Sequence, residues 1–163
     1  MSNCTLLRRA DRETSMEFTG EERIKAPRAE VWDFVTDPEK IAQCAPGLED
    51  GGLKVVDEDH FTVTVRAGVG FIRTVFEFNC EWVERDEPNK AVIKANGDAP
   101  GSSVAMTATM DLDDDGEGGT VMKWGTTAQI SGRLAGVGGR LINPVADRMT
   151  SQVFDCVRTK LEE

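Results

Sequence analysis

Apolar and polar residues alternate along most of the chain after residue 16, as in β-strands whose two faces meet different surroundings. The first such segment covers residues 16–25, with Phe18 and Ile24 on one parity. Six further segments are predicted to be strands, at 53–57, 60–67, 71–84, 90–96, 102–112 and 119–130, and alternation is clearest in 60–67, 71–84, 102–112 and 119–130. Short connections rich in Gly, Pro, Asp and Asn separate these six. Such connections join neighbouring strands, so the pattern predicts an antiparallel meander.

Two short helices are predicted between the first strand and the meander. Apolar residues at helical spacing fill residues 28–35. Asp37 then suits the N-cap of a second helix, with Pro38 at its first position. The dipeptide Pro46-Gly47 ends that helix.

A long amphipathic helix is predicted from Ser131 or Gly132 toward Leu161. Because Pro144 falls inside this pattern, we expect a kink or short break near Asn143. The start of this helix is rich in small residues, namely Gly132, Ala135, Gly136, Gly138 and Gly139. Because glycine is unfavourable inside a helix, these residues indicate either close contact with the sheet or room for a ligand beneath the helix.

This order of elements predicts an α+β fold in which a curved antiparallel sheet of about seven strands wraps around the long C-terminal helix. The chain has 163 residues, enough for one domain with its own core. Residues 1–15 are polar and are expected to form a disordered leader, which leaves 16–163 as a single domain.

Strand parity also identifies the side chains that face the long helix, and these are almost all apolar. The methionines among them suit either core packing or an adaptable lipophilic pocket. From the inward parity and the helix stripe we take as candidate cavity lining Phe18, Ile72, Phe76, Phe78, Trp82, Met106, Met110, Met122, Trp124, Leu134, Gly138, Leu141, Val145 and Met149. Glu22 is the only ionisable residue on the inward parity, which disfavours acid–base chemistry inside.

The net charge of −10 disfavours nucleic acid as a partner, because such a surface repels phosphate. No apolar stretch is long enough for a membrane-spanning helix. The four cysteines, Cys4, Cys44, Cys80 and Cys156, are scattered without metal-ligand spacing. We therefore expect free buried thiols in a reducing cytosol, with no metal and no cofactor.

Two features of the sequence resemble functional sites but have simpler interpretations. Residues 111–116 match the first half of a calcium-binding loop, but Met122 stands where a bidentate Glu is needed. This segment is predicted to be an acidic hairpin turn. His60, the only histidine, lies on the outward parity and is predicted to be a surface residue.

Several short motifs occur in an order that is informative as a set: Phe18-Thr-Gly20, Ala26-Pro27-Arg28 leading to Val31-Trp32, Asp37-Pro38-Glu39, Cys44-x-Pro46-Gly47, and the glycine-rich segment 132–142. Over about residues 16–161 the chain resembles the G-subunit family of carbon monoxide dehydrogenase. That family lies within the START-like (SRPBCC, helix-grip) superfamily of ligand-binding proteins.

The resemblance implies a non-enzymatic accessory protein that serves an aerobic molybdenum-containing carbon monoxide dehydrogenase or a related hydroxylase. It implies a lipophilic ligand, such as a respiratory quinone or a lipid, and a place in the cytoplasm or at the inner membrane face. Many members carry a membrane-anchoring tail after the domain. This chain stops at Glu163, so recruitment by a tail is not expected.

Two alternatives remain open at this stage. One is an enzyme of the cyclase or hydratase type, which the same superfamily contains, with Glu22 and Thr126 as its best acid–base pair. The other is a ligand-free interaction domain that docks on a partner enzyme.

Overall fold

The computed structural model describes residues 13–69 and 72–162, which form one sheet and a set of helices. The N-terminal part contains β1 (Glu13–Ile24), α2 (Arg28–Val35), α3 (Pro38–Ile41) and the 3-10 helix η1 (Ala42–Cys44). The meander contains β2 (Leu48–Val55), β3 (His60–Val69), β4 (Ile72–Asp86), β5 (Lys90–Ala99), β6 (Ser102–Asp114) and β7 (Thr120–Gly132). The chain then forms α4 (Arg133–Val137) and α5 (Gly139–Leu161).

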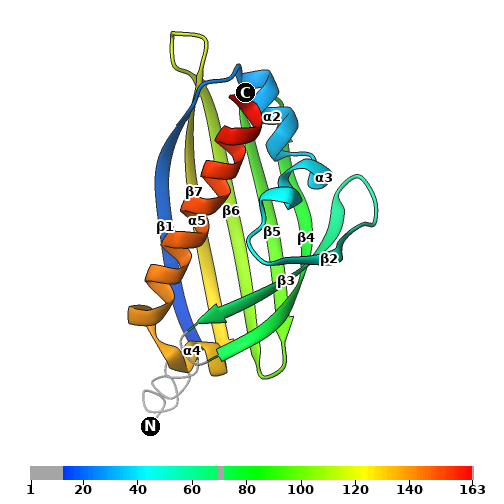
Figure 1. Ribbon diagram of the computed structural model, residues 1–163, viewed down its shortest axis with the longest axis vertical. Helices are drawn as coiled ribbons and strands as arrows, with labels where there is room; N and C mark the ends of the chain where they lie inside the picture. The colour runs from blue at the N-terminus through cyan, green and yellow to red at the C-terminus, as the bar shows by residue number, and fades with distance from the viewer. Residues whose placement is uncertain (1–12, 70–71, 163) are drawn as a thin grey trace.

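The seven strands form a single antiparallel sheet in the order β1-β7-β6-β5-β4-β3-β2. Helix α5 lies across one face of this sheet, and α2 and α3 lie near its C-terminal end (Figure 1). The predicted α+β class and the antiparallel meander are therefore confirmed.

Strand parity separates the two faces of the sheet as predicted. Along β4, Ile72, Phe76 and Cys80 are buried, whereas Arg73 and Glu77 are exposed. The buried residues form two apolar clusters, one toward α2 and one toward α4. The helix-facing side of the sheet is therefore the apolar side.

Some strand boundaries differ from prediction. β1 begins at Glu13, so residues 13–15 belong to a strand although we placed them in the leader. The rest of the predicted leader, residues 1–12, lies outside the described residues. β2 begins at Leu48, five residues earlier than predicted, because tertiary pairing with β3 recruits a glycine-containing stretch that strand periodicity misses.

The predicted break near Asn143 is wrong in position, because the C-terminal helix is interrupted at Gly138 instead. Gly138 has φ +85° and ψ 163°, a conformation that excludes helix and favours glycine. Pro144 lies inside the continuous helix α5, near its start. A Cβ at Gly136 or Gly138 would meet no atom within 4 Å, so close packing against the sheet does not explain these two glycines.

The expectation of four free thiols is also wrong, because Cys44 and Cys156 form a disulfide. Their Cα atoms are 5.5 Å apart although the residues are separated by 112 positions. η1 packs on α5, so the two cysteines meet only through the tertiary fold. Cys80 is free and buried as predicted, and Cys4 lies outside the described residues.

Candidate functional site

Two apolar cavities lie between α5 and the helix-facing side of the sheet. The first, the α2-side cavity, has a volume of about 360 Å³ and is lined by Val35, Ile41, Pro46, Phe61, Trp82, Ile93, Ala108, Thr109, Met110, Met122, Trp124, Thr126, Met149, Thr150, Val153, Phe154 and Val157. The second, the α4-side cavity, has a volume of about 390 Å³ and is lined by Phe18, Ala45, Pro46, Val63, Val65, Ala67, Val69, Phe76, Phe78, Cys80, Ala95, Val104, Met106, Ala128, Ile130, Leu134, Ile142, Val145, Ala146, Met149 and Val153.

The two cavities adjoin each other, since Pro46, Met149 and Val153 line both. Met149 and Val153 project from α5, and Pro46 follows η1. Each cavity falls in the size range of small-molecule sites, roughly 300–1,000 Å³. Because Met149 is unbranched and flexible, it is the shared wall best able to adapt to a guest.

Most of the predicted lining residues do line one of these cavities. The α2-side cavity contains Trp82, Met110, Met122, Trp124 and Met149, and the α4-side cavity contains Phe18, Phe76, Phe78, Met106, Leu134, Val145 and Met149. Three predicted residues line neither. Ile72 is buried in the core cluster near α4, Gly138 forms the helix break, and Leu141 is 47% exposed.

Sequence reasoning missed the contribution of the segment between α2 and β2. Ile41, Ala45 and Pro46 form part of the walls of the cavities. Strand parity makes no prediction for these three residues, because they lie in short helices and a loop. The α5 residues Val153 and Phe154 were also absent from the predicted lining, although Val153 belongs to the helical stripe.

Two tryptophans that line the α2-side cavity carry buried indole N–H groups without a partner in the described part of the chain. Nε1 of Trp82 and Nε1 of Trp124 are both buried and have no hydrogen-bond acceptor among the described residues. Both tryptophans line this cavity. A buried donor without an acceptor costs about 1–3 kcal/mol, so these two N–H groups lower the stability of the fold.

The only ionisable group among the residues that line the two cavities is the thiol of Cys80. Burial raises the pKa of this thiol to about 11, so it is protonated at neutral pH. Glu22 lines neither cavity, and its Oε1 lies 2.5 Å from Nη2 of Arg158 near the end of α5. The lining therefore provides no pair of groups for general acid–base catalysis.

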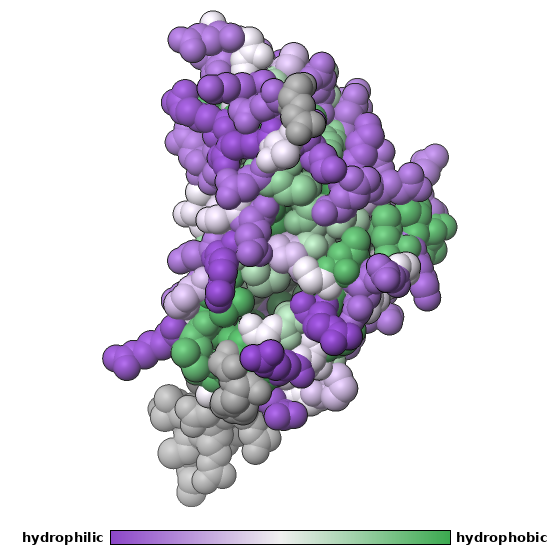
Figure 2. Space-filling model, viewed as in Figure 1, coloured by the Kyte–Doolittle hydropathy of each residue, from purple (hydrophilic) through white to green (hydrophobic). Residues whose placement is uncertain are grey.

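Apolar residues gather beside α5 and toward β2 on the face seen in Figure 2, within a surface that is otherwise hydrophilic. At the β2–β3 turn, Val55 is 51% exposed and Val56 is 68% exposed. Exposed apolar surface of this kind suits contact with an apolar partner or membrane.

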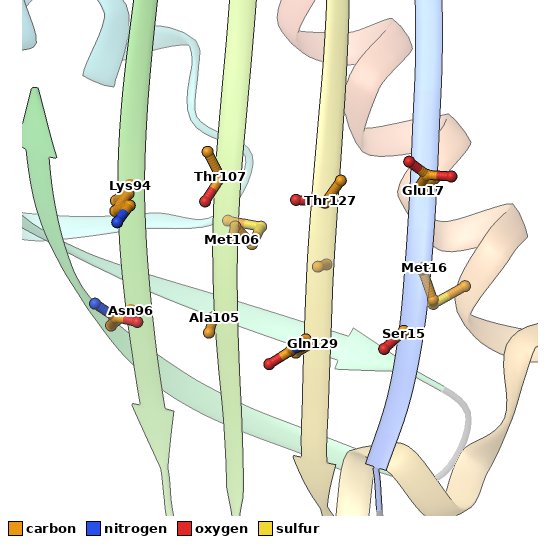
Figure 3. Close-up of a pocket in the computed structure, with 11 residues that line it drawn as sticks. Ser15, Met16, Glu17, Lys94, Asn96, Ala105, Met106, Thr107, Thr127 and Gln129 are labelled. Atoms are coloured by element: carbon orange, nitrogen blue, oxygen red, sulfur yellow. The ribbon is translucent and has the colours of Figure 1, made fainter. Parts of the chain in front are cut away.

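A groove of about 720 Å³ with mixed polar and apolar lining lies on the opposite face of the sheet. Figure 3 shows its side chains standing on β5, β6, β7 and β1, among them Lys94, Thr107, Thr127, Gln129 and Glu17. These residues are of the outward parity and mostly solvent-exposed. No buried polar side chain lines this groove, so the inner cavities are the stronger candidate site.

The two features that resemble chemical sites occupy the surface. His60 is exposed, and its Nδ1 lies 2.8 Å from Oδ1 of Asp57. Asp115 accepts hydrogen bonds from the backbone N–H groups of Glu117 and Gly119, which closes the acidic β6–β7 turn. Within residues 13–69 and 72–162, no group of three or more His, Cys, Asp or Glu side chains could hold a metal ion.

Comparison with known proteins supports the fold and the family resemblance. The family of the carbon monoxide dehydrogenase G subunit (CoxG) matches residues 20–162. No curated protein sequence matches the chain. Among the helices of the described residues, none has both the length and the apolar character required to cross a membrane.

Three solved structures show the shared fold. A conserved protein from Geobacillus kaustophilus has a TM-score of 0.83 at 20% identity, covering 90% of this chain and 95% of its own. The aromatase/cyclase from Streptomyces sp. R1128 has a TM-score of 0.64 at 12% identity, covering 91% of this chain and 94% of its own. Norcoclaurine synthase from Thalictrum flavum has a TM-score of 0.61 at 12% identity, covering 93% of this chain and 88% of its own. The chain therefore has the START-like, helix-grip fold.

Proposed function

Because the chain belongs to the CoxG family of carbon monoxide dehydrogenase, we propose that it is a non-enzymatic carrier of a lipophilic molecule. The carrier would serve a molybdenum-containing carbon monoxide dehydrogenase or a related hydroxylase. The observation that supports this proposal most directly is the pair of adjoining apolar cavities between α5 and the sheet.

The chemistry of the lining favours one class of guest. An apolar body fits the aliphatic and aromatic walls, and the hydroxyls of Thr109 and Thr126 in the α2-side lining would donate to a carbonyl oxygen. A quinone with an apolar side chain has both features, as does a lipid ester. A charged guest is disfavoured because no lining residue would neutralise it.

We propose the cytoplasm, at the inner face of the membrane, as the place where this carrier works. The exposed Val55 and Val56 and the apolar surface beside α5 suit brief contact with a bilayer or a partner enzyme. A respiratory quinone would be taken up from that bilayer.

The first test is extraction of the natively purified protein with organic solvent, followed by mass spectrometry. A stoichiometric quinone or lipid is the expected result. Binding of decylubiquinone, followed by quenching of tryptophan fluorescence, is the second test. Ala128→Phe should abolish this binding, because Ala128 is buried and lines the α4-side cavity.

Ala105→Phe is the matched control, since Ala105 lies on the neighbouring strand β6 but is exposed on the opposite face. It should leave the affinity for decylubiquinone unchanged. If neither extraction nor titration reveals an apolar guest, or if both variants bind equally well, the carrier proposal is wrong.

The enzyme alternative makes a different prediction. It depends on Glu22, whose carboxylate is already paired with Arg158 outside the cavity lining. Turnover of a cyclase or hydratase substrate that is lost in Glu22→Gln would favour the enzyme over the carrier.

A further inference from the structure

Residues 37–46, the cover segment, form part of the wall of both cavities. Within this segment Ile41 lines the α2-side cavity, Ala45 the α4-side cavity, and Pro46 both. Both cavities are partly open to solvent, and any movement of the cover segment away from α5 would widen both together.

The two ends of the cover segment are fixed to the rest of the fold. Before it, Nε1 of Trp32 in α2 donates to Oε1 of Glu87 at 3.1 Å. After it, the backbone N–H of Arg66 in β3 donates to the carbonyl of Gly47 at 2.7 Å. The segment is thus a flap attached at both ends.

Between those ends, the hydrogen bonds of the cover segment are local. The carbonyl of Asp37 accepts from the backbone N–H groups of Lys40 and Ile41, and that of Ala42 accepts from Ala45. Among the described residues, no hydrogen bond or salt bridge joins residues 37–46 to α5. Apart from apolar contact, the disulfide between Cys44 and Cys156 is the link that holds the flap to the helix.

We infer that Cys44 and Cys156 form a thiol–disulfide exchange site that controls access to the two cavities. A dithiol reductant attacks one sulfur of the pair through its thiolate and forms a mixed disulfide. Its second thiol then resolves that intermediate. The protein gains two thiols, and the reductant leaves as a disulfide, so two electrons and two protons are transferred in total.

The proposed location makes such chemistry reasonable. Disulfides in cytosolic proteins are usually transient or redox-sensing, because the thiol pool keeps most cysteines reduced. Cys156 is only half-buried, so it is the partner more accessible to an attacking thiolate. The oxidised protein holds its cover segment against α5, and the reduced protein lets that segment move away and widen the cavities.

Cys80 provides a reporter of opening within the chain, because its free thiol lines the α4-side cavity and is buried. The experiment uses the full chain with Cys4→Ser, so that Cys80 is the only free thiol when the disulfide is closed. The rate of Cys80 modification by N-ethylmaleimide is compared with that of a variant that also carries Cys44→Ala and Cys156→Ala. We expect modification to be about tenfold faster or more without the disulfide, as in a sub-global opening.

Loss of a disulfide also lowers global stability, and a control must separate this effect from local opening. Leu112→Ala lowers stability at a buried β6 residue that lines neither cavity and lies outside the cover segment. Modification rates are therefore compared at matched stability, with urea added to the more stable protein. If the two variants then react equally fast, opening is global and the inference is overturned.

Two further measurements test the exchange itself. Incubation of the folded protein with dithiothreitol should yield both thiols, and hydrogen exchange at residues 39–45 should then accelerate while β6 and β7 remain protected. A disulfide that dithiothreitol reduces only after global unfolding would overturn the inference.

Discussion

The indole ring of Trp124 lies directly over Gly20, its register partner on the neighbouring strand. A Cβ placed on Gly20 would come within 2.6 Å of Cζ2 and 2.7 Å of Nε1 of that ring. Glycine at this position therefore provides the space in which a cavity-lining indole lies flat against β1.

Gly20→Ala should displace the Trp124 ring and destabilise the protein by about 1–3 kcal/mol, as overpacking in a filled interior does. Urea denaturation gives the free energy of unfolding, and the tryptophan emission spectrum reports the displaced indole. The matched control is Gly125→Ala on β7, where the new Cβ would meet only ordinary contacts, the nearest at 3.7 Å. An equal loss of stability in both variants would contradict this account of Gly20.

Thr120 is fully buried, and its Oγ1 donates to the carbonyl oxygen of Ala26 at 2.7 Å. Thr120→Val keeps the shape but leaves that carbonyl without this donor, so stability should fall by about 1–3 kcal/mol. Thr127→Val on the same strand removes an outward-facing hydroxyl and should change stability by less than about 0.5 kcal/mol. Urea denaturation of the two variants makes the comparison, and similar losses would refute the role of this hydrogen bond.

The buried thiol of Cys80 should make stability depend on pH in alkaline solution. Burial raises its pKa from 9.0 to about 11 in the folded chain, so the unfolded chain loses its proton first as the pH rises. The stability that the protein owes to the protonated Cys80 thiol is fully present below about pH 9 and declines toward pH 11. Urea midpoints measured from pH 8 to 10 should fall less steeply in Cys80→Ala than in the wild type.

His60 is the only histidine in the chain, so its imidazole signals in a proton NMR spectrum need no assignment. The hydrogen bond to Asp57 raises the pKa of His60 above 6.5. Asp57→Asn should bring the titration midpoint back toward 6.5. The pKa of His60 is higher in the folded chain than in the unfolded chain. The His60–Asp57 pair therefore stabilises the fold fully below pH 6.5, and this stabilisation is lost as the pH rises through the pKa of the folded chain. An unchanged midpoint in Asp57→Asn would contradict the assignment.

Much of the fold follows from periodicity alone. Alternation along β4, β6 and β7 identified the helix-facing side chains, because a residue's parity in a strand fixes the face on which it lies. Most of the cavity lining could be predicted for the same reason. The stripe on α5 was less reliable, because Leu141 belongs to it by spacing but is exposed, while its neighbour Ile142 lines the α4-side cavity instead.

Contacts between distant segments could not be predicted in this way. Cys44 and Cys156 meet only because η1 packs on α5, and neither residue carries a local signal of the other. The position of Pro46 in the wall of both cavities has the same origin. The position of the Trp124 indole over Gly20 depends on the register between β1 and β7, which lie about a hundred residues apart in the sequence. The lack of a hydrogen-bond acceptor for the indole N–H among the described residues depends on this register as well.

The disulfide also divides the chain mechanically. It closes a covalent ring that contains β2 to β7, whereas β1 and α2 lie outside the ring. A force applied to the two ends of the oxidised chain can extend only the segments outside that ring. The 112-residue separation between the cysteines shields a contour length of about 370–400 Å, which becomes extensible only after the bond is reduced.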